Sequence, residues 1–558
     1  MTLADVDLRS IQEGRDLLRR SRVAADAFRH ASQEDVDRIC AAMAKAGSEM
    51  SETLARKAVE ESGFGNVVGK FQKNKFCTDV LWESLRDLKT CGIVHRDEER
   101  RYYQVAEPYG VILAVVPITN PTSTAMYKAL ISVKARNSIV VSPHPRGVEC
   151  IGDACRVKAE AAEAAGAPKD LILCHSSPTM QATQEMMSAR DTALILATGG
   201  PDLVRAAYSA GKPAYGVGPG NAPAFIERTA DLSHAVRAIV GSQMFDNSTI
   251  CASEQSVVID LPIYEQVQAE FVANGAHWCT VEEKNQLAGI VVEGRRVNPA
   301  IVGLYAHQIA AMAGFEVSEK TTVLMVEEEG VGWDYPLSVE KLSPILSVYK
   351  ADGWEAGCER CIEILDFGGR GHTLAIHSQD EDIIWAFVHE KPTHRILVNA
   401  PAAHGAVGFG TGLVPSMTLG CGAFGGNITS DNISAHNLVL IKHVGYGYEG
   451  LVESFPDFSE GPPRDISFTA MPCSPAPLAT SAVGVAGTSG PRERPVAPSP
   501  THPVYMGNPT HPASPFFGQD SEEKVEKNEE DTASSIPPDD GGSIPAHQRK
   551  KYRTSTTR

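Results

Sequence analysis

One cysteine stands in surroundings where a thiol could react. Residues 245–255 read Phe-Asp-Asn-Ser-Thr-Ile-Cys-Ala-Ser-Glu-Gln, which places Cys251 in a small polar segment between a helix-like run and a strand-like run. A structural cysteine is usually packed among Val, Leu and Ile, whereas this segment predicts a thiol that meets solvent and substrate and can form the nucleophilic thiolate. Because most single cysteines serve packing alone, the assignment needs support from the rest of the chain.

Size and charge limit the classes of protein to which the chain can belong. Its 558 residues, 42% hydrophobic and 22% charged, are enough for two or three globular domains with complete cores. A net charge of −18 argues against nucleic acid or an anionic membrane as a partner. No apolar run reaches the roughly 18 residues of a membrane span, and the polar, acidic start of the sequence is unlike a signal or transit peptide. Twelve cysteines without framework spacing suit a reducing compartment, so we expect a cytoplasmic protein.

A second cysteine motif favours packing rather than chemistry. Cys358 and Cys361 form a Cys-x-x-Cys pair, which occurs in redox and zinc sites. No second pair follows at ribbon spacing, and residues 356–365 have the pattern of an amphipathic helix. We therefore predict no metal site.

The hydrophobic pattern predicts an α/β fold. Residues 5–88 have a helical period, with Ser32 as the expected N-cap of a helix. From residue 110 onward, apolar strands alternate with helices, the pattern of a mostly parallel, doubly wound sheet. The expected strands are 110–116, 138–141, 171–174, 192–197 and 214–216, and the expected helices are 122–134, 151–165, 179–189 and 201–210. A second α/β region from about 240 to 419 contains helix 263–273 and strand 395–399, and the Gly-rich stretch 420–426 returns the chain to the first region.

The composition changes near residue 459. Sixteen of the 35 prolines lie in the last 98 residues, together with an acidic run at 520–531 and a basic end at 549–553. Too few apolar residues remain there to offset the entropy of ordering, so we expect a disordered C-terminal tail, residues 459–558. The tail is either an extension without function or an interaction element in which Phe516-Phe517 or 466–471 folds on a partner.

Five motifs follow one another in the order of a known family. They are Ile118-Thr-Asn-Pro-Thr-Ser-Thr124, Ser142-Pro-His-Pro-Arg146, Ala197-Thr-Gly-Gly200, Gly216-Val-Gly-Pro-Gly-Asn-Ala-Pro223 and the Cys251 segment. Together they resemble the CoA-acylating aldehyde dehydrogenases, both the aldehyde dehydrogenase half of bifunctional aldehyde–alcohol dehydrogenases and stand-alone acylating relatives. The resemblance covers about residues 10–450. No iron-dependent alcohol dehydrogenase half follows, and the tail lies outside the resemblance.

The resemblance implies a fold and a reaction. It implies the aldehyde dehydrogenase fold, with a Rossmann-like NAD(CoA)-binding domain (1–239, including the N-terminal helices), an α/β catalytic domain (240–424) and a segment that returns to the first domain and serves oligomerisation (425–458). It further implies NAD-dependent, reversible oxidation of a short aldehyde to its acyl-CoA through a cysteine thiohemiacetal and thioester, with NADP as an alternative cofactor. Cys251 would be the nucleophile, Asn120 and the backbone N–H of Cys251 the oxyanion donors, and His372 an acid/base.

The family's cofactor-binding positions can also be placed on this sequence. They fall on Thr119, Ser142, Pro143, His144, Gly199, Gly200, Gly218, Pro219 and Gly220. Gly199 and Gly200 open a predicted helix directly after a strand, where free backbone N–H groups and the helix dipole can face a phosphate. A Gly-Gly pair alone is a weak signal, because it is not the Gly-x-Gly-x-x-Gly fingerprint of dinucleotide-binding folds.

The sequence departs from hydrolytic aldehyde dehydrogenases at one position. Those enzymes carry Glu-Leu-Gly-Gly-Lys, whose glutamate activates water, and the alignment places Val217 at that glutamate. Without a carboxylate there, the thioester should survive until coenzyme A attacks it. A replacement base remains open, and Glu254 is close to Cys251 in sequence.

Several questions stay open at the level of sequence. Acetaldehyde and propionaldehyde fit the family. Sulfoacetaldehyde is an alternative that would need a cation in the pocket, and the sequence assigns none; Arg136 and Arg146 lie near the cofactor motifs and could serve phosphates instead. A hydrolytic enzyme, or a bacterial microcompartment cargo that binds the shell through its tail, are the rival functions. His404 is the weaker histidine candidate. Strand 438–442 and residues 447–453 resemble the subunit-pairing segment of the family, so we expect a homo-oligomer, a dimer or a tetramer.

Overall fold

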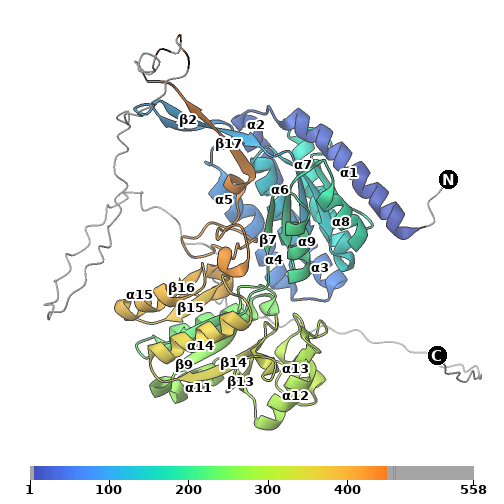
Figure 1. Cartoon of the computed structure of the whole chain (residues 1–558). Helices are drawn as coiled ribbons and strands as arrows, with labels where there is room; N and C mark the ends of the chain where they lie inside the picture. Colours follow the sequence, from blue (N-terminus) through green and yellow to red (C-terminus); the bar gives the residue numbers. More distant parts are fainter. Residues whose placement is uncertain (1–4, 449–456, 458, 460, 462–558) are drawn as a thin grey trace, which may run out of the picture. The chain divides into compact units, whose positions relative to one another are not determined.

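The computed structural model describes residues 5–448, 457, 459 and 461 (Figure 1). Apart from Ser459 and Gly461, the predicted tail lies outside these residues, as do its segments 466–471 and 516–517. Within the described part the α/β prediction is confirmed, since two parallel sheets carry helices on their faces. No helix of this part is both long and apolar enough to cross a membrane.

A five-stranded parallel sheet forms the first half of the chain. Its strand order is β5 (Ile172–Cys174), β4 (Ser138–Pro143), β3 (Val111–Val116), β6 (Thr192–Thr198) and β7 (Ala214–Val217). All six residues of β3 are buried, because a central parallel strand has helices on both faces and is therefore apolar throughout. Each predicted strand of this region is confirmed, with ends that differ by one or two residues.

Alternate residues of β3 pack on opposite helical layers. Val111, Leu113 and Val115 join one core with helices α1, α8 and α9, and Ile112, Ala114 and Val116 join the other with α2, α6 and α7. The helices of this half are α1 (Val6–Phe28), α2 (Gln33–Glu49), α3 (Ser51–Ser62), α4 (Val67–Lys75), α5 (Leu81–Leu85), α6 (Pro121–Lys134), α7 (Val148–Ala164), α8 (Met180–Ser188) and α9 (Pro201–Ser209). Ser32 caps α2 by accepting a hydrogen bond from Asp35 N, as predicted.

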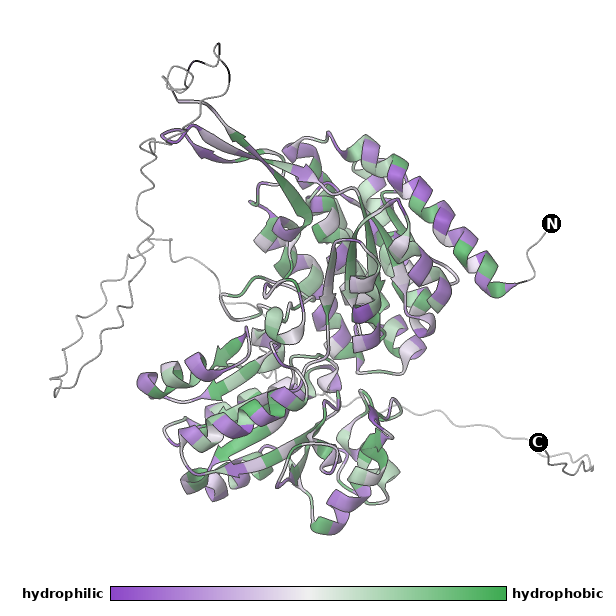
Figure 2. Cartoon of the chain, viewed as in Figure 1, coloured by the Kyte–Doolittle hydropathy of each residue, from purple (hydrophilic) through white to green (hydrophobic). Residues whose placement is uncertain are grey.

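A seven-stranded parallel sheet forms the second half. Its order is β10 (His277–Trp278), β13 (Leu324–Glu327), β14 (Ile345–Ala351), β9 (Glu254–Asp260), β8 (Ala222–Ile226), β15 (Leu374–His377) and β16 (Ile396–Val398). The helices are α10 (Leu232–Met244), α11 (Tyr264–Ala273), α12 (Val281–Val291), α13 (Ala306–Ala313), α14 (Trp354–Phe367), α15 (Glu381–Glu390) and α16 (Ala402–Gly405). In Figure 2 the strands of both large sheets are mostly green, whereas the helices mix purple and green. Strand β8 precedes the boundary predicted at residue 240, yet it pairs within this second sheet.

A separate antiparallel sheet has the order β1 (Gly92–Asp97), β2 (Tyr102–Pro108) and β17 (Val439–Gly445). Figure 1 shows β2 and β17 running together away from the rest of the described chain. The short strands β11 (Val292–Glu293) and β12 (Arg296–Val297) form a hairpin. The predicted strand 438–442 is therefore confirmed as β17, and it pairs with β2 of the first half.

Candidate active site

A cavity of about 580 Å³ opens at the carboxyl ends of β3, β4, β6 and β7. In open parallel sheets, ligands bind at this edge because the loops that follow the strands converge there. The same cavity also reaches residues of the second half, namely Ile250, Cys251, Glu340 and Leu342. The cavity thus joins the motifs of the first sheet to the cysteine segment that precedes β9.

The segment before Cys251 is held in an unusual backbone conformation. Asp246, Asn247 and Ser248 all have positive φ, between 51° and 63°, a region that costs a residue with a side chain roughly 1–2 kcal/mol. Asn247 donates to Gly303 O and accepts from the amide of Asn66, so the polar side chain is used inside the protein. The expectation of a solvent-facing polar segment is therefore wrong, because its polar groups hold the loop against α4. Cys251 itself is half-buried and lines the cavity.

Cys251 lies within hydrogen-bond reach of one histidine. His372 Nε2 is 3.2 Å from Cys251 Sγ, and His372 Nδ1 is 2.8 Å from Thr373 Oγ1. Burial lowers the pKa of His372 to about 3, helped by the nearby Arg395 cation, and burial raises the pKa of Cys251 to about 12, helped by Glu340. The contact therefore joins a neutral thiol to a neutral imidazole, and a base is needed before the sulfur can attack a carbonyl.

Gly220 allows Cys251 to sit where it does. A Cβ at residue 220 would lie 2.0 Å from Cys251 O and 3.3 Å from the His372 ring. The N–H of Gly220 donates to Glu340 Oε1 at 3.1 Å. Any larger residue at 220 would push the cysteine backbone or the imidazole away, so this glycine positions Cys251 rather than lining the cavity.

Asn120 lines the cavity just before helix α6, where Pro121 occupies the first helical position. Its Oδ1 accepts a hydrogen bond from Lys73 Nζ at 2.7 Å, and its Nδ2 donates to Thr249 O at 3.0 Å. The amide N–H group therefore points toward the backbone of the segment that ends in Cys251. The same nitrogen also contacts Thr119 Oγ1 at 3.3 Å, so the oxyanion role of Asn120 stays a prediction.

Eight of the nine predicted cofactor positions line the same cavity. They are Thr119, Ser142, Pro143, His144, Gly199, Gly200, Gly218 and Pro219, and Gly220 is the exception. Gly200 is the N-cap of α9, and a Cβ on Gly200 or Gly218 would meet no atom within 4 Å, so both glycines leave their part of the cavity open. Backbone N–H groups at the start of α9 suit a phosphate. The cavity thus fits a dinucleotide in chemistry and in volume.

Comparisons with known proteins decide the family. Residues 2–291 match the aldehyde dehydrogenase family. This chain belongs to that family. It is 40% identical over 448 residues to the bifunctional aldehyde-alcohol dehydrogenase AdhE of Escherichia coli K12, a match that covers 79% of this chain and 50% of the relative. The chain thus spans about half the length of this relative and of the aldehyde-alcohol dehydrogenase of Clostridium acetobutylicum.

Two solved structures extend the comparison. An acetylating aldehyde dehydrogenase from Geobacillus thermoglucosidasius is 47% identical, with a TM-score of 0.80, and the match covers 82% of this chain and 100% of that one. A propionaldehyde dehydrogenase from Rhodopseudomonas palustris, solved with bound propionyl-CoA, is 25% identical, with a TM-score of 0.71, and the match covers 78% and 94%. The predicted resemblance to acylating aldehyde dehydrogenases is therefore confirmed.

An acidic residue that the sequence did not reveal, Glu340, lies in the cavity of this aldehyde dehydrogenase. Val217 lines the cavity and Glu254 does not; Glu254 is buried and accepts from Ala402 N. Glu340 lines the cavity, and burial raises the pKa of its carboxyl to about 8. No local motif marks Glu340 in the sequence, since it reaches the site through the strand order of the second sheet.

The cations considered from sequence have other contacts. Arg136 donates to Arg29 O and Ala106 O, and Arg146 donates to Ser62 O and lies over the ring of Phe64. Neither arginine lines the cavity, and their assignment to phosphates stays a prediction.

A third arginine, not considered from sequence, lies at the site. Arg395 is buried and donates to His372 O at 3.0 Å and to Gly420 O at 2.6 Å. It thereby fixes the backbone that carries the imidazole. His404, by contrast, packs against Phe245 with 4.2 Å between the ring centroids and 38° between the ring planes, and it is not among the cavity-lining residues.

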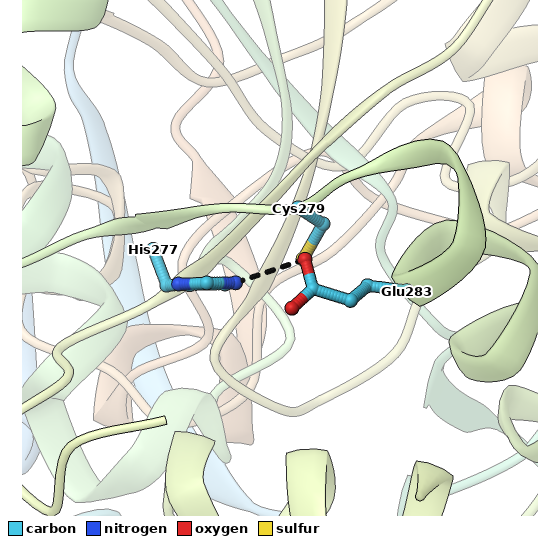
Figure 3. Close-up of side chains that lie close together, drawn as sticks. All are labelled: His277, Cys279 and Glu283. Carbon is cyan, nitrogen blue, oxygen red and sulfur yellow. Dashed lines mark hydrogen bonds and ion pairs between the residues drawn. The ribbon is translucent and has the colours of Figure 1, made fainter. Parts of the chain in front are cut away.

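One cluster has the residue types of a metal site. Among the described residues, ligand atoms of His277, Cys279 and Glu283 lie within 4.8 Å of one another, and Figure 3 shows the imidazole directed at the carboxylate. The Glu283 carboxylate already accepts from Thr280 N at 2.7 Å and from His277 Nε2 at 3.1 Å, in a capping box at the start of α12. The positive end of a helix dipole disfavours a cation there, so helix capping accounts for this cluster.

The Cys-x-x-Cys pair also has a structural explanation. Cys358 and Cys361 lie on the buried face of α14, in a core that includes Phe225 of β8. The packing interpretation of this pair is confirmed.

Proposed function

We propose that this chain oxidises a short, uncharged aldehyde to its acyl-CoA with NAD or NADP, reversibly, through a thioester on Cys251. The contact between Cys251 Sγ and His372 Nε2 at the edge of a dinucleotide-sized cavity is the observation that carries the proposal. The acetylating relatives and the propionyl-CoA complex of a structural neighbour support coenzyme A as the acceptor.

Each residue of the site would have a separate role in the reaction. His372 takes the thiol proton as the sulfur attacks the aldehyde carbon, because the imidazole is neutral and aligned with the sulfur. The amide N–H of Asn120 and the backbone N–H of Cys251 stabilise the oxyanion, and one such donor is commonly worth about 3 kcal/mol. The bound nicotinamide supplies the acceptor for hydride. After His372 has lost this proton to solvent, it can take the proton of the CoA thiol as the CoA sulfur attacks the thioester carbon and displaces the Cys251 thiolate.

The lining of the cavity favours an uncharged substrate. Besides Asn120 and Glu340, it includes the apolar side chains of Ile250, Leu342, Val407 and Met417. Among the described residues that line it, none is Lys or Arg. A sulfonate or a second carboxylate would lose its hydration there without a cationic partner, which is strongly unfavourable. We therefore favour acetaldehyde or propionaldehyde over sulfoacetaldehyde.

Two features favour coenzyme A over water as the acceptor. Val217 offers no base, and the carboxyl of Glu340 is held by Gly220 N on one oxygen. With its pKa raised to about 8, the carboxyl of Glu340 is mostly protonated at neutral pH. The thioester would therefore persist until a thiol arrives.

We also propose that the chain forms a homo-oligomer through the antiparallel sheet. Strand β17 is an edge strand, and it exposes Leu440 and Val444, with Tyr446 directly after it. An unpaired edge of seven residues with exposed apolar side chains suits pairing with a second copy. Light scattering of the wild type beside Val444→Glu would test this: a shift of the variant to the monomer mass is expected, and an unchanged mass contradicts it.

The reaction is tested by reduction of NAD⁺ and NADP⁺ with acetaldehyde, propionaldehyde or sulfoacetaldehyde, with and without CoA. We expect CoA-dependent turnover of the two uncharged aldehydes and none in Cys251→Ala. Turnover without CoA that yields free acid would overturn the acylating assignment, and preference for sulfoacetaldehyde would overturn the substrate class.

A further inference from the structure

Three buried charges lie directly beneath the cavity. The side chains of Lys70, Lys73 and Asp246 are at most 1% exposed, and both ammonium groups contact Asp246 Oδ2, at 2.6 and 2.5 Å. Burying ions is expensive unless each has close partners. Both ammonium groups share one carboxylate oxygen. Each ammonium group has three N–H donors, so its remaining donors need other acceptors.

The two lysines reach different groups of the site. Lys70 Nζ donates to the backbone carbonyl of Thr119 at 2.6 Å, whereas Lys73 Nζ donates to the side-chain Oδ1 of Asn120 at 2.7 Å. Lys73 also contacts Thr249 Oγ1 at 3.1 Å. The two lysines therefore suit a direct comparison, because they lie on the same helix and contact the same carboxylate but donate to different acceptors in the site.

The contact with Lys73 determines which end of the Asn120 amide faces the cysteine segment. An ammonium group can only donate, so it selects Oδ1 and turns Nδ2 toward Thr249 O and the Thr119 hydroxyl, at 3.0 and 3.3 Å. A cation on the carbonyl end of an amide also draws electron density from its N–H end. In a buried site this makes the N–H a stronger donor.

We propose that Lys73 is a positioning residue that orients and polarises the Asn120 amide for oxyanion stabilisation, and that Asp246 holds Lys73 in place. The proposal rests on the role assigned to Asn120 above. Phe245, whose ring centroid lies 5.3 Å from Lys73 Nζ, completes the enclosure of the ammonium group. Lys70 holds the backbone of Thr119 and has no contact with the amide.

The test is a double-mutant cycle between Lys73→Met and Asn120→Ala, measured as the rate of the first turnover of NADH formation. Lys73→Met should slow this step roughly tenfold when Asn120 is present and less than twofold when residue 120 is alanine, because contacting residues couple. Lys70→Met is the matched control, and its effect should be the same in both backgrounds. The rate of Cys251 alkylation by iodoacetamide in each variant reports whether the thiol site is intact.

The outcomes separate the two assignments. An equal loss from Lys73→Met in both backgrounds overturns the positioning role, and so does coupling of Lys70→Met as strong as that of Lys73→Met. A first turnover unchanged by Asn120→Ala overturns the role of Asn120 itself. If Lys73→Met does not fold, Lys73→Gln replaces it: its amide can still donate to Oδ1 without the charge, and an effect independent of residue 120 again overturns the proposal.

Discussion

His372 Nε2 lies 3.2 Å from Cys251 Sγ, although 121 residues separate the two in the chain. The imidazole comes from the loop before β15 and the thiol from the loop before β9, and both strands flank β8. The geometry depends on the strand order of the second sheet. The raised pKa of the thiol and the lowered pKa of the imidazole keep both residues neutral, so we expect little thiolate at neutral pH.

Replacement of the imidazole should slow the chemical step. His372→Asn keeps a side chain of similar reach but removes the base, and positioned bases commonly contribute roughly 10²–10⁴-fold. We expect a first turnover slower by at least about 10²-fold with unchanged NAD affinity. His377→Asn is the control, because His377 is also buried with a lowered pKa but lies at the far end of β15. Comparable losses in both variants would mean that the effect is one of packing.

Alkylation of the ligand-free thiol should depend steeply on pH. Because the pKa of Cys251 is raised to about 12, the thiolate fraction grows about tenfold per pH unit between pH 7 and 10. Iodoacetamide labelling of Cys251, followed by peptide mass spectrometry, should therefore accelerate without a plateau over this range. A plateau beginning near pH 6 would instead reveal a thiolate–imidazolium pair.

Glu340 should suppress the thiolate only when it is ionised. Its pKa is raised to about 8, so the wild-type carboxyl is mainly neutral at pH 6.5 and mainly charged at pH 9.5. Glu340→Gln stays neutral, and it should speed alkylation of Cys251 several-fold at pH 9.5 while leaving the rate at pH 6.5 unchanged. Glu254→Gln, a buried carboxyl outside the cavity, should change neither rate. An equal effect of Glu340→Gln at both pH values would contradict this electrostatic coupling.

The close approach at Gly220 can be tested by one added methyl group. Gly220→Ala would place a Cβ 2.0 Å from Cys251 O, so we expect a loss of about 1–3 kcal/mol in the free energy of unfolding and a slower first turnover. Gly152→Ala in α7 is the control, because its Cβ would meet nothing within 4 Å and alanine favours a helix by up to about 1 kcal/mol. Thermal unfolding and single-turnover kinetics of both variants check the pair.

Local sequence predicted most of the fold and part of the site. Runs such as 111–116 and 193–197 are apolar throughout, which is the pattern of central parallel strands. Gly199 and Gly200 could be singled out because they lie between a strand and a helix. Asn120 and His372 needed the family resemblance, and Glu340 was missed.

Glu340 was missed because its position at the site depends on tertiary structure. Glu340 precedes β14, and it meets the site because β14 pairs with β9. The local hydrophobic periodicity does not predict which strands of a sheet become neighbours. The same limit explains the wrong expectation at Asp246 and Asn247, whose polar side chains bind α4 and its N-cap rather than water.

Restoring a carboxylate at residue 217 should change the acceptor. Val217 lies at the end of β7 and lines the cavity, at the position where hydrolytic relatives carry their glutamate. Val217→Glu places a base beside the thioester, and we expect CoA-independent release of free acid at least about tenfold above the wild type. This is below the roughly 10²–10⁴-fold of a well-positioned base, because burial raises the pKa of the new carboxyl. Val217→Gln has the same shape without the base and should not release acid. Acid formation in both variants would mean that added space or polarity, rather than a base, admits water, and the assignment of Val217 as the residue that preserves the thioester would fail.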